Sequence, residues 1–462
     1  MATASGTAGT ATRDHGLVKG VGLAALTAAI VNGVVGAGVF TLPAVMALNL
    51  GPRAPLAFLV CAVAMGAVVW CTADAIRRVP TSGGIYGTVE AAFGPRAGFV
   101  TGFVGIWLSS VLACGGITAA FADAAGAAVP ALSGALPRAA VILVVIGGLM
   151  AVNLRGVGFA ARFITVATLL KLIPLALFLG VGIWFIDSAN LHGAAAGGAA
   201  GGASAGDFSL GGGFGRAVIF ALFAFSGMET PLSASGEVAN PSRTVPRAIV
   251  LSMGFVLLLY VAVQVVAQGL LGADLAHSAT PLTSAIATVS PALGIVLAAG
   301  AAASRLIWIS SDLLGAPRLL FAFARDKLLP GALGTLDGRF HVPRTAIVVH
   351  AVLVVILAVT GTFEALAILA GLASTFLYSM ACAAAWRLSA RGVGAGAVGG
   401  GTGAGVEITR SPLIPLAAIV GVAAMIAIAV QAKPDELFGL AAAVAIALGI
   451  YAGRRLFGNS GQ

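Results

Sequence analysis

The feature that most restricts how this chain can fold is a glycine-rich interruption inside a long apolar stretch. Residues 18–48 are apolar and long enough to cross a bilayer, yet Gly33, Gly36, Gly38 and Pro43 interrupt them. Glycine and proline are poor helix formers. A backbone N–H or C=O left unpaired in hydrocarbon costs several kcal/mol. A helix broken here is therefore tolerable only where protein covers the break or the break lines a cavity.

A second apolar stretch is interrupted in the same way. Residues 223–231 contain Ser226, Gly227, Glu229 and Pro231 in the middle of an apolar run. Two broken helices at corresponding positions of two halves are the best sequence indication of a transporter's binding site. The alternative is that the glycines only allow close helix packing, but packing requires neither a glutamate nor a proline beside them.

The composition places the chain among membrane proteins. Hydrophobic residues make up 59% of the 462 residues, charged residues only 9%, and the mean hydropathy is +1.06. The net charge of +9 is spread singly between apolar runs, without the basic stripe of a nucleic-acid-binding protein. The four cysteines lie inside apolar runs, which indicates buried hydrophobic side chains and neither a disulfide framework nor a metal site. We expect no cofactor and no nucleic-acid partner.

Apolar stretches of about 20 residues predict twelve membrane spans. Their limits are 18–48, 54–76, 97–122, 139–154, 163–186, 214–236, 247–271, 291–317, 345–361, 364–386, 412–431 and 436–453. With both termini in the cytoplasm, nineteen of the 25 lysines and arginines fall on the cytoplasmic side, as the positive-inside rule requires. Only Arg53, Arg138, Arg216 and Lys433 fall outside, and Lys171 and Arg305 fall within spans.

Two glycine- and alanine-rich connectors, at 193–213 and 391–405, divide the chain. The first separates spans one to five from spans six to ten, so each five-span unit opens with its broken helix, as an inverted repeat requires. The predicted organisation is a cytoplasmic tail (1–17), a transporter core (18–386) made of repeats 18–186 and 214–386 joined by the outer loop 187–213, a cytoplasmic linker (387–411), helices 11 and 12 (412–455) and a cytoplasmic C-terminal tail (456–462).

The two breaks together offer complementary backbone groups. If the second half-helix begins near Val39, the amides of Ala37, Gly38 and Val39 form its partly positive end, which suits a carboxylate. A half-helix that ends near Ser226 leaves carbonyls that suit an ammonium group. The carbonyls concerned are those of Phe223, Ala224, Phe225 and Ser226. The sequence therefore predicts a receptor for a zwitterionic amino-acid head group.

Three segments of the chain resemble signatures of the amino acid–polyamine–organocation (APC) permeases. Residues 36–40, Gly-Ala-Gly-Val-Phe, look like the first-helix signature, and residues 225–229 with 236–247 look like the sixth-helix signature and its following loop. Pro317-Arg318 with residues 324–330 resembles the motif after the eighth helix, although Lys327 stands where glycine is usual. The resemblance covers roughly residues 18–386.

This resemblance implies an all-α membrane protein with 12 transmembrane helices. It implies a leucine-transporter-like (LeuT-like) 5+5 inverted repeat with discontinuous helices 1 and 6, and alternating-access transport of amino acids or related amines. Phe223 would be the aromatic gate over the substrate. The predicted substrate-binding residues are Val34, Gly36, Ala37, Gly38, Val39, Phe223, Ala224, Phe225, Ser226, Gly227 and Asp312.

Ionisable residues inside spans are costly and functional by default. In relatives that look proton-coupled, a lysine at the position of Lys171 stands where sodium-coupled members hold an ion. This predicts sodium-independent coupling through Lys171, and a static lysine between helices is the alternative.

Glu229 is the second predicted coupling residue, with a structural role left open. Asp312 would face a cationic substrate side chain. The alternative is a buried pair or polar network with Arg305, which lies seven residues away on the same helix face. His350 is a lone imidazole, a packing residue or a proton relay.

The sequence thus predicts a proton-coupled, sodium-independent amino acid permease and not an enzyme. We expect it in the plasma (inner) membrane with both termini cytoplasmic, as a monomer or homodimer in the lipid bilayer. The first alternative is an amino acid/polyamine exchanger (antiporter) whose substrates are cationic, and a passive channel is another. A serine hydrolase is a remote one, because its nucleophile-like pattern around Ser204 lies in a Gly/Ala linker with no strand before it.

Overall fold

The computed structural model describes residues 21–79, 83–155, 172–192, 212–232, 238, 240–338, 340, 342–393 and 411–457. Within these ranges every regular element is a helix, and the only sheet-like contact is an isolated parallel bridge between Val21 and Val238. The all-α prediction is confirmed. Lys171, Ser204, both terminal tails for the most part and most of the two glycine-rich connectors lie outside the described residues.

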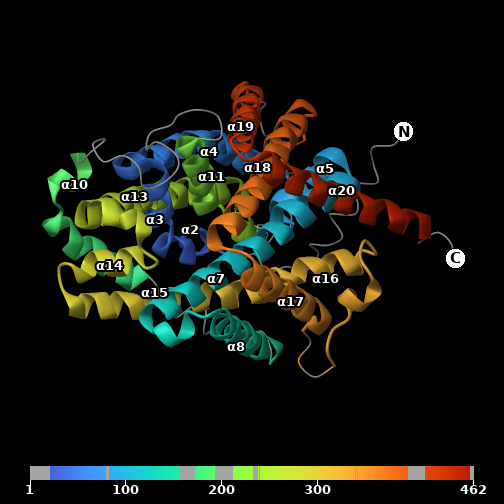
Figure 1. The fold of residues 1–462 in the computed structure, drawn as a ribbon. Coiled ribbons are helices and arrows are strands. Elements are labelled where there is room, and N and C mark those ends of the chain that lie inside the picture. Colours follow the sequence, from blue (N-terminus) through green and yellow to red (C-terminus); the bar gives the residue numbers. More distant parts are fainter. Residues whose placement is uncertain are drawn as a thin grey trace.

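Figure 1 shows the helices coloured along the chain. In chain order they are α2 (Leu23–Val34), η1 (Ala37–Phe40), α3 (Leu42–Leu50), η2 (Gly51–Arg53), α4 (Ala54–Arg78), α5 (Gly84–Phe93), α6 (Pro95–Val100), η3 (Thr101–Leu108), α7 (Ser109–Ala128), η4 (Pro130–Leu132), α8 (Ala135–Leu154), η5 (Ile183–Phe185), α10 (Ser188–His192), α11 (Gly213–Phe225), α12 (Glu229–Leu232), α13 (Pro241–Leu271), η7 (Gly272–His277), α14 (Pro281–Ala287), α15 (Pro291–Gly315), α16 (Pro317–Arg325), η8 (Gly331–Gly334), α17 (Arg344–Thr360), α18 (Phe363–Ala390), α19 (Leu413–Ala429) and α20 (Pro434–Phe457).

Seven helical stretches in the described part of the chain are long and apolar enough to cross a membrane. They are Leu42–Arg78, Pro95–Ala128, Ala135–Leu154, Arg243–His277, Pro291–Arg325, Phe363–Ala390 and Pro434–Arg454. Shorter apolar helices are Leu23–Val34, Leu172–Phe185, Arg344–Thr360 and Leu413–Ala429. All of them overlap stretches that hydropathy marks as apolar in the sequence, which confirms the prediction of several spanning helices.

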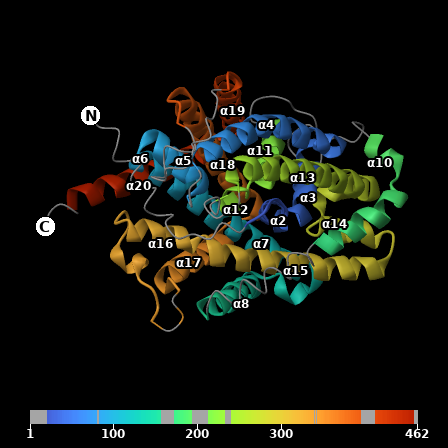
Figure 2. The same cartoon turned by 180° about the vertical axis from the view of Figure 1, so that it is seen from behind.

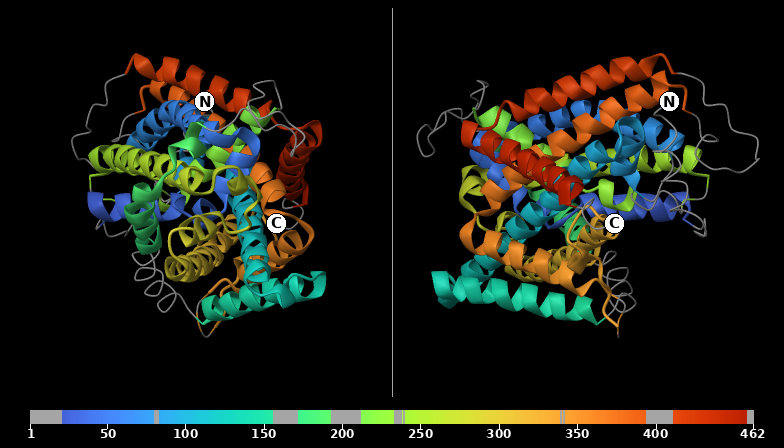
Figure 3. Two further views of the ribbon diagram at one scale, coloured as in Figure 1. Left: turned by 60° about the vertical axis from the view of Figure 1, so that its left-hand side comes forward. Right: turned by 90° about the vertical axis from the view of Figure 1, so that its right-hand side faces the viewer.

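The helices differ in how much of their apolar surface other helices cover. In the most apolar part of α8 only 11% of residues are buried in the protein, and in α20 only 6%. The corresponding share is 72% both in the stretch that contains α7 and in α18. α8 lies at the edge of the molecule in every view, while α7 and α18 cross its centre (Figures 1, 2 and 3). Apolar faces left open on peripheral helices suit contact with lipid.

Both expected interruptions are present. The first helix stops at Val34, continues as the short 3-10 turn η1, and resumes as α3 at Leu42. The other stops at Phe225 and resumes as α12 at Glu229. Between these two ends Gly227 has a φ of +119°, which only glycine adopts without strain.

The helix α13 supports the first interrupted helix along its length. It packs against α2 and α4 (Figure 2), and three of its buried polar side chains donate hydrogen bonds to backbone carbonyls of the interrupted helix. These are Ser252 to Thr27 at 3.2 Å, Tyr260 to Val34 at 2.8 Å and Gln264 to Pro43 at 3.3 Å. The donors recur at multiples of four residues, so one face of α13 carries them all.

A buried arginine joins the end of α4 to the end of α18. Arg78 is fully buried and its Nε donates to Asp74 at 2.6 Å. The same guanidinium donates to the Val393 carbonyl at 3.1 Å and to the Ser389 hydroxyl at 3.4 Å. Asp74 belongs to α4 itself and balances the buried charge, while the hydrogen bonds to Val393 and Ser389 tie the end of α4 to the end of α18.

The backbone conformation at Lys327 explains why glycine is the usual residue at this position of the motif after the eighth predicted span. Lys327 follows α16 with a φ of +59°, and its side chain is exposed. The left-handed region costs a non-glycine residue roughly 1–2 kcal/mol. Glycine adopts this conformation without that cost.

We therefore predict that Lys327→Gly raises the free energy of unfolding by up to about 1 kcal/mol, because glycine removes the left-handed strain at some cost in chain entropy. Denaturant unfolding in detergent measures the difference. Lys327→Ala is the control, since it removes the same exposed side chain but keeps Cβ. Equal stability of the glycine and alanine variants would contradict the prediction.

Candidate functional site

A cavity of about 260 Å³ lies where the two interrupted helices meet. Both breaks contribute to its wall, together with residues of α7, α13 and α15. The predicted site residues that line it are Val34, Gly36, Gly38, Phe223, Ala224, Ser226, Gly227, Glu229 and Asp312. The structure thus brings together most of the residues that the sequence singled out.

Two of the predicted binding residues do not line this cavity. Val39 and Phe225 are 2% and 1% exposed and belong to the hydrophobic core. The Phe225 ring packs against Phe58 and Tyr260, with centroids 6.3 and 5.8 Å apart. The motif marks backbone positions, but the helical turn directs these two side chains into the core. The side chain of Ala37 lies outside the described part of the chain.

The two breaks touch each other at their glycines. A methyl group on Gly33 would lie 2.6 Å from the Gly227 carbonyl oxygen, and one on Gly227 would lie 2.6 Å from the Gly33 carbonyl oxygen. Real Cβ atoms do not approach other atoms so closely. The two interrupted helices can meet only because both positions lack a side chain.

The amide end of the first break differs from the prediction in its register. The 3-10 turn begins at Ala37, two residues before Val39, and the α-helix begins only at Leu42. The Gly36 amide turns back to the Val34 carbonyl at 2.6 Å, and no side chain caps the turn. The glycines favour a tight turn over an immediate helix start.

The carbonyls of the second break are less free than the sequence suggested. The Phe223 carbonyl accepts the Ser226 amide at 3.2 Å, and the Ala224 carbonyl accepts the Tyr260 hydroxyl at 3.1 Å. Tyr260 also reaches the Val34 carbonyl at 2.8 Å. A carbonyl oxygen has two lone pairs, so the Phe223 and Ala224 carbonyls retain the capacity to accept another donor. The Val34 carbonyl also accepts the Gly36 amide, and it keeps that capacity only while the single Tyr260 hydroxyl hydrogen points to Ala224.

Hydrogen bonds of Glu229 stabilise the backbone conformation of the second break. Its Oε2 accepts the Gly227 amide at 3.1 Å and the Tyr378 hydroxyl at 3.2 Å. The side chain is 8% exposed and borders the cavity. These contacts give the glutamate a structural role, and its predicted coupling role stays a prediction.

Two aromatic side chains lie against the glycines of the first break. A methyl group on Gly38 would lie 3.3 Å from the Phe223 ring, which packs edge-on against Phe363 at 6.0 Å. A methyl group on Gly36 would lie 2.8 Å from Nε1 of Trp308. Phe223 and Trp308 both border the cavity, so side chains added at these glycines would press on its aromatic wall.

Asp312 reaches the cavity and is hydrogen-bonded on both carboxylate oxygens. The Ser110 hydroxyl donates to Oδ1, and His350 Nε2 lies 2.9 Å from Oδ2. The alternative of a pair between Asp312 and Arg305 is wrong for the described contacts. Arg305 donates to the Thr41 hydroxyl at 3.0 Å and borders a separate cavity of about 270 Å³.

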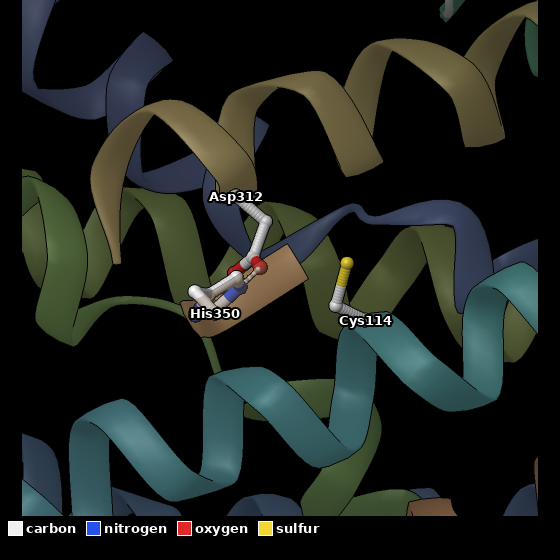
Figure 4. A group of neighbouring side chains, drawn as sticks. All are labelled: Cys114, Asp312 and His350. Atoms are coloured by element: carbon white, nitrogen blue, oxygen red, sulfur yellow. Dashed lines mark hydrogen bonds and ion pairs between the residues drawn. The ribbon is translucent and has the colours of Figure 1, made fainter. Parts of the chain in front are cut away.

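The thiol of Cys114 completes a cluster with Asp312 and His350 (Figure 4). One ligand atom from each lies within 4.8 Å of the others. A thiolate, an imidazole and a carboxylate are a ligand set that Zn²⁺ accepts. Here the carboxylate and the imidazole bond directly to each other, and the expectation of no metal remains untested.

The sequence analysis missed several residues that shape this site: Ser110, Tyr260, Trp308 and Tyr378. One signal was available for Tyr260. With Gln264 and Gln268 it forms a polar row at four-residue spacing in an otherwise apolar run, and all three are buried. Polar residues on one face of an apolar helix indicate backbone or polar partners.

We predict that Gly33→Ala destabilises the folded protein by about 1–3 kcal/mol, the usual cost of overpacking. The new methyl group would collide with the Gly227 carbonyl and separate the breaks. Denaturant unfolding in detergent measures the loss. Gly66→Ala is the matched control, because nothing lies within 4 Å of that methyl position, and it should be neutral or stabilising. A Gly33→Ala protein as stable as the control would refute direct contact between the breaks.

Comparisons with known proteins agree with this architecture. The sequence model of the amino acid permease family matches residues 21–451. Similar proteins include the vacuolar cationic amino acid transporter 2 of Arabidopsis thaliana (28% identical, covering 72% of this chain and 54% of that protein), the branched-chain amino acid permease BcaP of Lactococcus lactis (27%, 74% and 76%) and the serine/threonine exchanger SteT of Bacillus subtilis (27%, 73% and 75%).

The alignment thus spans little more than half of the Arabidopsis transporter but about three quarters of the two bacterial ones. The family match covers nearly the whole described chain. Together with the apolar helices, it identifies a multi-pass membrane protein. This chain belongs to the amino acid permease family.

Proposed function

We propose that this protein is a secondary active transporter for an amino acid that works by alternating access. The observation that carries the proposal is the small cavity between two interrupted helices in a member of the amino acid permease family. Twelve spans in a LeuT-like 5+5 inverted repeat, with helices 11 and 12 appended, complete the proposed architecture. Position in the cell membrane with both termini cytoplasmic, as a monomer or homodimer, follows the charge distribution and the resemblance.

The amino-acid head group would bind to the backbone at the breaks. Gly36 and Gly38 border the cavity at an uncapped turn, which supports carboxylate binding by the backbone from Gly36 to Gly38. The carbonyls of Val34, Phe223 and Ser226 are the proposed acceptors for the ammonium group. Phe223, between Gly38 and Phe363, is the proposed gate.

A second candidate is exchange of cationic substrates, such as arginine, lysine or a diamine. Glu229 and Asp312 border the cavity, and no lysine or arginine is among its described lining residues. An acidic wall favours a cation over a second anion. The names of the similar proteins refer to cationic amino acids, branched-chain amino acids and serine or threonine. Because these names point to different substrates, the acidic wall is the better basis for proposing the substrate class.

Coupling to protons without sodium is part of the proposal. Lys171 is proposed as one coupling residue on the resemblance alone, because it lies outside the described part of the chain. Glu229 is the other candidate. Protons and one small amine-bearing molecule are then the only solutes that the cycle requires.

Counterflow in proteoliposomes tests this proposal. Vesicles loaded with one unlabelled amino acid or diamine should take up the same labelled compound, and a panel should show preference for cationic compounds. Gly38→Leu should reduce counterflow by about tenfold or more, because even a methyl group there reaches the Phe223 ring in the cavity wall.

Gly254→Leu is the matched control for that substitution. Gly254 is exposed on α13 with nothing within 4 Å of its methyl position, so the same leucine should leave counterflow intact. Absence of counterflow for every amino acid and diamine in the wild type would reject the proposed function. Equal counterflow in the two leucine variants would reject this cavity as the binding site.

A further inference from the structure

The wall of the cavity contains an acid and a base in direct contact. His350 of α17 lies with Nε2 at 2.9 Å from Oδ2 of Asp312 on α15. We propose that Asp312 and His350 bind and release one proton as a unit, and that a cation in the cavity displaces this proton. The inference rests on the proposed transport of amines and adds the group that couples it to protons.

The pair is buried, but one of its members reaches the cavity. The His350 side chain is fully buried and that of Asp312 is 6% exposed. Asp312 borders the cavity, whereas His350 does not. The carboxylate therefore stands between the imidazole and any bound substrate, and charge in the cavity acts on the histidine through Asp312.

The hydrogen bonds of the pair leave one atom available for a proton. When Nε2 carries the hydrogen donated to Asp312, the other ring nitrogen, Nδ1, has a lone pair. Nδ1 is buried and has no hydrogen-bond partner among the described residues. A proton that binds there converts imidazole to imidazolium, and no other bond forms or breaks.

Charge balance decides when that proton is bound. With neutral imidazole the pair carries one negative charge, and with imidazolium it is neutral. An uncompensated charge is costly inside a protein in a membrane. An empty cavity therefore favours the protonated pair, whereas a substrate cation beside Asp312 supplies the positive charge itself and repels the proton on His350.

Other charged groups do not replace this mechanism. The thiol of Cys114 on α7 is the other titratable group of the cluster (Figure 4). On α8 the neutral Asn153 donates to the Ser310 carbonyl of α15. The remaining charged residues of α7, α8, α15, α16 and α17 make no described contact with the pair; they are Asp123, Arg138, Arg305, Arg318, Arg325 and Arg344. Glu229 borders the same cavity but bonds to Gly227 and Tyr378.

Proton release on substrate binding tests the inference directly. Purified wild-type protein in weakly buffered detergent solution is mixed with lysine, and a pH dye records released protons. We expect up to about one proton per bound lysine, with an affinity for lysine that falls as much as about tenfold per pH unit as the solution is acidified. A neutral amino acid should release far fewer protons.

His350→Gln separates the pair from other titrating groups. The glutamine amide can still donate to Asp312 but does not titrate, so lysine binding should release no proton and its affinity should no longer depend on pH. His277→Gln is the matched control, because His277 is exposed in η7, and it should behave as the wild type. Asp312→Asn should also abolish proton release if it folds.

The outcomes distinguish this inference from the proposed function. Wild-type counterflow without proton release on lysine binding would overturn the inference and leave the transporter proposal standing. Proton release that persists in His350→Gln would assign the proton to another group and also overturn it. Absence of any amino acid counterflow in the wild type would instead remove the transport function on which both depend.

Discussion

The structure depends on the satisfaction of backbone groups that two helices release inside an apolar interior. Water is not available there to replace lost helical hydrogen bonds. Distant parts of the chain supply partners for the carbonyls: Tyr260 of α13 for Val34 and Ala224, and Trp308 of α15 for Gly33 at 3.5 Å. The Gly227 amide donates to the nearby Glu229, whose carboxylate accepts a hydrogen bond from the distant Tyr378. Each break is therefore held by helices that surround it.

The same constraint produces the cavity. Where the helices stop, the chain lacks the side chains that would fill the space, and Gly33 and Gly227 bring the two breaks into contact. One hydroxyl, that of Tyr260, lies between the carbonyl ends of both half-helices. Because this hydroxyl has one hydrogen, the two carbonyls share a single donor.

The sequence predicted the breaks but not what holds them. Glycine and proline inside an apolar run are local signals, and they located both interruptions to within a few residues. Val39 and Phe225 were predicted to bind substrate through a backbone amide and a backbone carbonyl. Their side chains are buried in the core, and backbone binding at these two positions stays a prediction. The pairing of Asp312 with His350 joins residues on different helices, and only tertiary packing reveals it. The polar row of α13 (Tyr260, Gln264 and Gln268) was visible in the sequence, but its role can be assigned only once its hydrogen-bond partners are known.

The order of the buried polar residues also separates this site from that of a hydrolase. In a serine nucleophile site the imidazole lies between the hydroxyl and the carboxylate, so that it can take the hydroxyl proton. Here the carboxylate of Asp312 is in the middle, with Ser110 on one oxygen and His350 on the other. Ser110 therefore donates to the carboxylate, and the histidine does not contact its hydroxyl in the order that such a site uses. In this order the histidine adjusts the charge of the carboxylate, and the carboxylate presents that charge to the cavity.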